Sequence, residues 1–178
     1  TPVVSSAASD VYKRQGGQFI SAAEQITPKG FRAVIRLNLD ATWYLTTQAA
    51  SLSMLAEGYG KVACITMTPS RGMPGMTHSS ASRAAVESLV RTWAAEWASR
   101  GVRTVAIAPG IVHTEAMERY GIDPAQVATV VPAGRLQTPQ EVAELVAFCA
   151  APAGDYITGT TLVADGGLNV SAPSPLHA

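Results

Sequence analysis

Short apolar runs that follow glycine-terminated helices are the feature that most constrains the fold of this chain. Lys61–Met67 (KVACITM) and Val102–Ala108 (VRTVAIA) each begin directly after a glycine, and both are predicted to be buried strands. Thr160–Ala164 is a third short strand, closed by the turn Asp165-Gly166-Gly167. Because strands alternate with helical stretches, we expect an α/β fold with a parallel sheet, whose ligands bind at the carboxyl ends of the strands.

Three stretches beside these strands have the spacing of amphipathic helices. Residues 28–56 place apolar side chains at steps of three and four, and residues 79–99 do the same. In residues 138–150, Thr138 can cap a helix and Glu141 completes a capping box. The stretch 111–137 has no such period, and we expect it to be irregular.

The composition is that of a well-buried globular chain, because 47% of the 178 residues are hydrophobic and only 15% are charged. The formal net charge is zero, which argues against nucleic acid or an anionic membrane as a partner, and no apolar stretch is long enough to span a bilayer. Cys64 and Cys149 lie in apolar runs and are interpreted as buried hydrophobic residues in a reducing, cytoplasmic setting. Trp93 and Trp97 are interpreted as core or as a helix-packing interface.

The two ends of the chain are set apart from this pattern. Residues 1–15 lack apolar periodicity, and the run DVYKRQ at 10–15 resembles the translation of a sequencing-library adaptor, so we expect a disordered or adaptor-derived extension. Residues 171–178 are rich in Ser, Pro and Ala and are expected to form a flexible tail. Residues 16–170 then form one domain.

The motifs that carry chemistry follow one another in a recognisable order. They are Gly16-Gly17-Gln18-Phe19, Asn38-Leu39, Gly60-Lys61-Val62, Ala81-Ser82-Arg83-Ala84-Ala85-Val86, Pro109-Gly110-Ile111-Val112-His113-Thr114, Pro132-Ala133-Gly134-Arg135, Ile157-Thr158-Gly159 and Asp165-Gly166-Gly167. In this order and spacing they resemble the short-chain dehydrogenase/reductase family over about residues 16–167. The segment GGQFISAAEQI, the pair His78-Ser79 and Trp97 after Glu96 are similar to its fatty acyl-CoA branch, which holds peroxisomal-type trans-2-enoyl-CoA and 2,4-dienoyl-CoA reductases.

The resemblance assigns catalytic roles to positions at which this chain partly differs from the family. Asn38 falls where an asparagine holds a water in a proton relay. Met67 falls where a serine orients the substrate carbonyl; a thioether cannot donate a hydrogen bond, and the neighbouring Thr66 and Thr68 are open as alternatives for contacting substrate.

Ser79 and Arg83 stand at the places of the family's tyrosine and lysine. A lysine beside a phenol lowers the phenol's pKa, so that the phenol can act as a general acid. A serine hydroxyl is a much weaker acid, and a guanidinium does not make it one. Arg83 can still hold a cofactor ribose and supply positive potential, so we keep Asn38, Ser79 and Arg83 as the candidate catalytic residues.

The loop from Pro109 to Thr114 matches the family segment that contacts nicotinamide. The resemblance implies that the backbone of Val112 pairs with the carboxamide, that Thr114 adds a side-chain bond, and that Pro109 and Gly110 shape the turn. It further implies NAD(P)H as cofactor, with NADPH favoured, and a homodimer or homotetramer. No metal ligation is expected, because His78 and His113 lack metal-ligand spacing and are interpreted as surface or loop residues.

These features predict a nicotinamide-dependent oxidoreductase that acts on a small molecule. Loss of the acidic tyrosine favours reduction of an activated double bond, as in an enoyl thioester such as an acyl-CoA, over carbonyl–alcohol interconversion. Two alternatives stay open. One is a general carbonyl or alcohol oxidoreductase, favoured if Thr66 or Thr68 converges with Ser79, and the other is a catalytically silent relative that acts in subunit association.

No glycine-rich turn between a strand and a helix occurs near the start of the sequence, since Gly58-Tyr59-Gly60 precedes a strand. We therefore expect the nucleotide-binding half of the Rossmann-like sheet, with its phosphate site, to be absent. The strand Lys61–Met67 would then lack a partner on its inner edge, and the chain alone would bind nicotinamide cofactor negligibly and be inactive.

Overall fold

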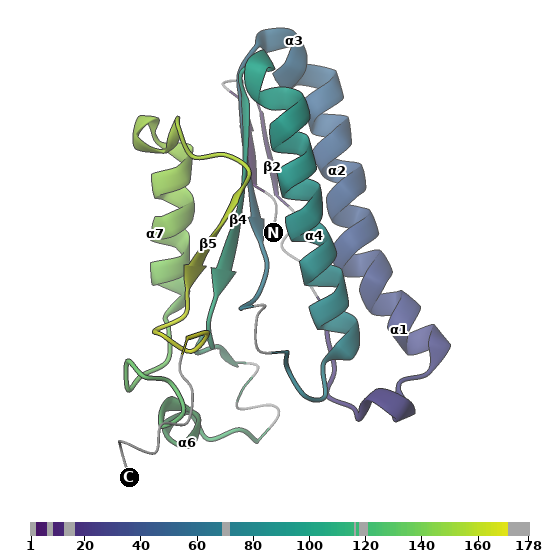
Figure 1. Cartoon of the computed structure of the whole chain (residues 1–178), viewed down its shortest axis with the longest axis vertical. Coiled ribbons are helices and arrows are strands. Elements are labelled where there is room, and N and C mark those ends of the chain that lie inside the picture. The colour runs from purple at the N-terminus through teal and green to yellow at the C-terminus, as the bar shows by residue number, and fades with distance from the viewer. Residues whose placement is uncertain are drawn as a thin grey trace.

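Helices cover both faces of a twisted sheet in the computed structural model, which describes residues 3–6, 9–12, 17–68, 72–115, 117 and 121–170 (Figure 1). The strand order is β2-β1-β3-β4-β5. The long helical segments α1–α3 and α4 lie on one side of the sheet, and α7 lies on the other (Figure 1). A core cluster on each side of the sheet, one with α4 and one with α7, joins the three layers.

The three predicted strands are confirmed as neighbours in a parallel arrangement. They are β3 (Gly60–Ile65), β4 (Val102–Pro109) and β5 (Thr160–Ala164). Ile65 of β3 pairs with Ile107 of β4, which in turn pairs with Leu162 of β5. This register brings the carboxyl ends of β3 and β4 to one edge of the sheet, where a ligand of a parallel sheet is expected.

Two further strands correct the expectation for the amino-terminal segment. β1 (Val3–Ser6) and β2 (Ser9–Tyr12) form an antiparallel pair, and β1 also pairs antiparallel with β3, with Val4 opposite Val62. These eight residues of the stretch expected to be a disordered or adaptor-derived extension are strands here, and the expectation that β3 lacks a partner on its inner edge is wrong. Four-residue strands are too short to show a period, so periodicity alone misses them.

The first predicted helix is confirmed as one continuous helical segment with two local expansions. It consists of α1 (Pro28–Ile35), η2 (Arg36–Asp40), α2 (Ala41–Ala49), η3 (Ala50–Met54) and α3 (Leu55–Glu57), after the short turn η1 (Ala23–Gln25). η2 and η3 are π-helical turns. The N–H of Ala41 donates to the carbonyl of Arg36, five residues earlier, as a π turn requires. Asn38 sits in the middle of η2 and is fully buried.

The second predicted helix forms the core contact of one face. α4 (Thr77–Trp97) continues into η4 (Ala98–Arg100). Trp93 and Trp97 stack with ring centroids 5.5 Å apart and belong to the core cluster, which also contains Cys64. Cys149 lies in the cluster on the other face, so both cysteines are buried as predicted.

The third predicted helix is confirmed together with its capping box. α7 (Pro139–Ala150) begins after Thr138, whose hydroxyl accepts from the Glu141 N–H, while the Glu141 carboxylate accepts from the Thr138 N–H at 2.8 Å. The stretch expected to be irregular contains the short helix α6 (Pro124–Ala128), and η5 (Pro152–Gly154) follows α7. Residues 171–178, expected to be a tail, lie outside the described residues.

Acid should loosen the start of α7, because hydrogen bonds from Arg135 and from the Thr138 backbone lower the pKa of Glu141 to about 2. A carboxyl whose pKa is lowered on folding stabilises the fold above its ordinary pKa of 4.5, and it loses that effect as the pH falls toward 2. We expect the unfolding midpoint to fall across this window, and to fall less in a Glu141→Gln variant. Denaturant unfolding at graded pH measures this, and equal slopes in both proteins would contradict it.

Candidate functional site

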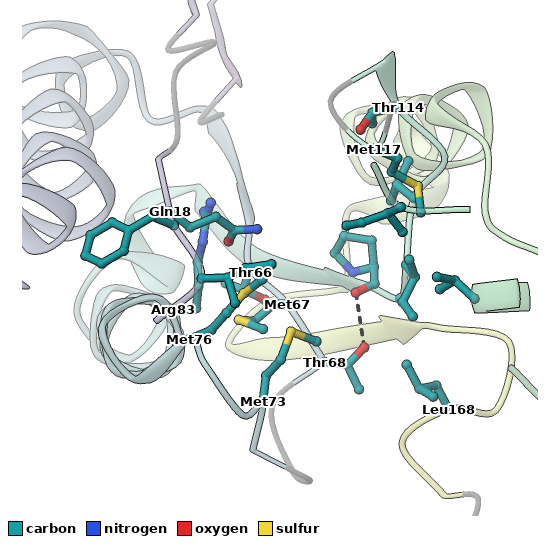
Figure 2. Close-up of a pocket in the computed structure, with 18 residues that line it drawn as sticks. Gln18, Thr66, Met67, Thr68, Met73, Met76, Arg83, Thr114, Met117 and Leu168 are labelled. Atoms are coloured by element: carbon teal, nitrogen blue, oxygen red, sulfur yellow. Dashed lines mark hydrogen bonds between the residues drawn. The ribbon is translucent and has the colours of Figure 1, made fainter. Parts of the chain in front are cut away.

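A cavity of about 470 Å³ opens where the carboxyl ends of β3 and β4 meet (Figure 2). Its walls come from Thr66–Thr68 after β3, from the loop 109–114 at the end of β4, from the loop that contains Gln18, and from Arg83 on α4. The volume is that of an ordinary small-molecule site. The sheet geometry thus brings every predicted cofactor-binding and substrate residue to one cavity, although these residues lie far apart in the sequence.

Met67 lies at the serine position that the resemblance assigned, and it faces the first turn of α4. Its sulfur is 3.9 Å from the hydroxyl of Ser79, which is fully buried. The hydroxyls of the two threonines beside it form hydrogen bonds with other groups. Thr66 donates to the Glu87 carboxylate at 3.1 Å, and Thr68 donates to the Pro109 carbonyl at 3.1 Å. Neither threonine is paired with Ser79, so the convergence that would favour a general carbonyl oxidoreductase is not observed.

Arg83 is held at the end of β3 by one of its guanidinium nitrogens, Nη1, which donates to the Ile65 carbonyl at 2.6 Å. Burial lowers the pKa of this guanidinium from its ordinary value. Arg83 still brings positive potential to the cavity, because a guanidinium remains charged at neutral pH. Among the described residues that line the cavity, Arg83 is the only ionisable one.

Gln18 is a candidate site residue that the sequence reasoning did not single out. Its side-chain oxygen accepts a hydrogen bond from the Ser79 hydroxyl at 3.0 Å. The amide nitrogen has no partner among the described residues and lies in the cavity wall, so it can donate to a ligand. The available signal was position, since Gln18 is the polar side chain directly after a glycine pair in the motif series.

Asn38 fastens the Gln18 loop to α4. Its oxygen accepts from the Gly17 N–H at 3.1 Å, and its nitrogen donates to the Gly17 carbonyl at 2.9 Å and to the Ser82 hydroxyl at 3.3 Å. Ser82 in turn donates to the Ser79 carbonyl. The Asn38 side chain is therefore occupied in positioning the loop.

The loop after β4 leaves a matched pair of backbone groups free. Gln137 forms hydrogen bonds with the two residues that flank Val112. The Gln137 N–H donates to the Ile111 carbonyl at 3.0 Å, and the His113 N–H donates to the Gln137 carbonyl at 2.8 Å. The N–H and carbonyl of Val112 point away from this bridge and have no partner among the described residues. A donor and an acceptor on one residue fit a primary carboxamide, which offers one of each.

Gly110 makes this loop possible because it passes closely over Asp165. A Cβ at Gly110 would lie 2.7 Å from the Asp165 Cα. The Asp165 carboxylate accepts from the Gly167 N–H at 3.0 Å and from the Asn169 N–H, which fixes the turn after β5. A close backbone contact beside the cavity therefore joins the turn Pro109-Gly110 to the turn Asp165-Gly166-Gly167.

His78 corrects a prediction. We expected a surface or loop histidine, but His78 is fully buried in the first turn of α4, and its ring meets Phe19 edge-on at 4.1 Å. Its Nδ1 accepts from the Ser79 N–H at 2.7 Å. The first N–H groups of a helix need acceptors, and the residue before α4, Met76, provides no side-chain cap. His113 is exposed, as expected.

The described part of the chain offers neither a metal site nor a membrane-spanning helix. Within it, no group of three or more His, Cys, Asp or Glu side chains is placed to hold a metal ion. None of its helices has both the length and the apolar character needed to cross a membrane.

The parallel sheet, with a cavity at the carboxyl ends of its strands, defines a Rossmann-like α/β protein. Residues 4–169 match the family model described as enoyl-(acyl carrier protein) reductase. The chain therefore belongs to the short-chain dehydrogenase/reductase family, in the part that this model covers, and the recognition from sequence motifs is confirmed.

Curated relatives and solved structures support the same placement. The chain is 40% identical to a probable 2,4-dienoyl-CoA reductase of Bacillus subtilis, over 85% of this chain and 62% of that protein. It is 39% identical to a 3-oxoacyl-[acyl-carrier-protein] reductase of Synechocystis, over 78% of this chain and 56% of that protein. A gluconate 5-dehydrogenase from Burkholderia cenocepacia, solved with NADP and tartrate, is similar with a TM-score of 0.82 and 29% identity, covering 89% of this chain and 64% of that one. The chain thus spans about six tenths of each relative's length.

Proposed function

We propose that the whole protein reduces the activated carbon–carbon double bond of an enoyl thioester, with NAD(P)H as the hydride donor. The observation that carries this proposal is the chemistry of the cavity wall. Arg83 is the only ionisable side chain among its described residues. Met67 and the neighbouring Ser79 stand where the resemblance places a carbonyl-orienting serine and an acidic tyrosine. Donors and positive charge are present, while none of the described residues of the wall is an acid able to protonate an alkoxide.

The residues of the loop 109–114 fit a nicotinamide. The N–H and carbonyl of Val112, which have no partner among the described residues, would hold its carboxamide. Thr114 would add a hydroxyl contact, and Arg83 would meet the adjoining ribose. When bound, the reduced cofactor supplies a hydride and leaves oxidised. The solved relative that contains NADP supports NADPH as the form used.

The chain's own groups act on the thioester oxygen. As a hydride forms a bond to the β-carbon, the electrons of the double bond move toward the thioester oxygen, which becomes an enolate. The Gln18 amide nitrogen, which lies in the cavity wall, and the positive charge of Arg83 stabilise that oxygen. The α-carbon then takes its proton from water, so no acidic side chain is needed. Asn38 and Ser79 act by holding Gln18 in place.

The alternative, a carbonyl or alcohol oxidoreductase, is favoured by the name of the Synechocystis relative, a 3-oxoacyl-[acyl-carrier-protein] reductase. A catalytically silent protein that acts in subunit association, as a homodimer or homotetramer, is the third candidate. It rests on the same replacements at Met67, Ser79 and Arg83.

An assay of the whole protein separates the three candidates. We expect oxidation of NADPH with hexenoyl-CoA, and at least about a hundredfold lower kcat/KM with 3-oxohexanoyl-CoA, since a general acid contributes about that much to carbonyl reduction. A double variant, Ser79→Tyr with Arg83→Lys, should raise the rate with the ketone. Turnover of the ketone alone would establish the alternative, and no turnover of either substrate would favour the silent protein.

A further inference from the structure

We infer that the cavity binds the acyl chain of its substrate against a wall of methionines, and that this wall accepts chains of different lengths. The inference rests on the proposed function for the identity of the substrate as an acyl thioester. We call Met67, Met73 and Met76 the methionine wall, and all three line the cavity (Figure 2).

The distribution of methionine in the protein is uneven. The chain contains five methionines, and four of them, Met67, Met73, Met76 and Met117, line this one cavity. The fifth, Met54, is fully buried in the core cluster beside α4. The members of the methionine wall gather on one side of the cavity, while Met117 lies with Thr114 on the other side (Figure 2). Three segments of the chain therefore contribute the same side chain to one space.

A fixed backbone carries these side chains. The Met76 N–H donates to the Met73 carbonyl at 3.0 Å, which closes the turn before α4. The Gly75 carbonyl accepts from the Ser21 N–H at 3.0 Å, which ties that turn to the loop of Gln18. The half-buried side chains of the wall extend from this fixed turn and from the end of β3. Adaptation to a ligand can then come from side-chain rotation alone.

Methionine suits such a role because its side chain is unbranched, polarisable and flexible, so it can reshape around ligands of different length. Branched apolar side chains line other parts of the cavity, among them Ile122, Val127 and Leu168. Met67 contacts Ser79, which places one end of the wall beside Gln18. A thioester carbonyl held there would direct its acyl chain along the methionines.

The size of the cavity fits this occupant. A methylene takes up about as much space as a water molecule, roughly 30 Å³, and the cavity measures about 470 Å³. It therefore has room for a nicotinamide ring together with an acyl chain of several carbons. No described lining residue other than Arg83 carries a charge that would repel or misplace such a chain.

Calorimetric titration with saturated acyl-CoA probes, from butanoyl-CoA to hexadecanoyl-CoA, tests the inference without turnover. For the unchanged protein we expect affinity to rise about threefold to fourfold for each methylene that becomes buried, and then to level off. Met73→Leu and Met76→Leu replace flexible side chains by branched ones of similar volume. Each variant should lose at least about tenfold in affinity for the longer probes, with butanoyl-CoA affected little.

Met54→Leu is the matched control, because it makes the same change in the core, away from the cavity. It should leave the length profile unchanged, and circular dichroism shows that each variant is folded. A wild-type affinity without any dependence on chain length overturns the inference, as does an unchanged profile in both wall variants. Length-dependent binding without reduction of hexenoyl-CoA would instead overturn the proposed function, while it would support the methionine wall as the binding site of the acyl chain.

Discussion

Replacing Arg83 by methionine should lower kcat for the enoyl thioester by about a hundredfold to a thousandfold in the whole protein. The guanidinium is the only ionisable group among the described residues of the cavity wall, and it is anchored by its bond to the Ile65 carbonyl. Negative charge develops on the thioester oxygen only as the hydride is transferred. Loss of Arg83 should therefore affect kcat more than KM. Steady-state kinetics with hexenoyl-CoA and NADPH measures both.

Two variants show whether the loss comes from the charge in the cavity. Arg83→Lys keeps a positive charge and should retain most of the activity. Arg91→Met removes an exposed arginine two helical turns further along α4 and should change little. If Arg83→Met and Arg91→Met gave equal rates, the charge in the cavity would have no part in the reaction.

The helices and the parallel strands of this fold could be predicted because the sequence patterns that indicate them are local. The period of residues 28–56 predicted the first helix, and the pattern Thr138, Pro139 and Glu141 predicted where α7 begins. The π turn around Asn38 could not be predicted, because the local period does not mark it and the Asn38 amide is bonded to the Gly17 backbone, which is distant in the sequence. The pairing of β1 with β3 depends on contacts between segments that are far apart in the sequence.

The candidate site was predictable in its backbone and less so in its side chains. The loop around Val112 lies where its motif indicated, at the end of β4. Gln18, Met73 and Met76 were missed, because a glutamine or a methionine carries no specific signal until the fold shows which surface it faces. His78 was misjudged for a related reason. A lone histidine looks polar, yet at the start of a helix without a side-chain cap it can satisfy a backbone N–H from within the core.

Gly101→Ala should be strongly destabilising, with a loss of more than about 3 kcal/mol in the free energy of unfolding. Gly101 ends η4 with φ of +82°, and a Cβ there would lie 1.7 Å from the Gly58 carbonyl oxygen. The obstacle is backbone, so no side chain can turn aside to make room. Since Gly58 precedes β3 and Gly101 precedes β4, relief would have to move one strand against the other.

Gly58→Ala is the matched control for that change, because Gly58 also has a positive φ, of +66°, but a Cβ there meets nothing within 4 Å. Its cost is then only that of the left-handed backbone, about 1–2 kcal/mol. Urea unfolding of both variants measures the difference, which is the part due to the contact between the two turns. Equal losses would mean that the turns before β3 and β4 can separate freely, and that their close approach does not help to set the register of the two strands whose carboxyl ends carry the cavity.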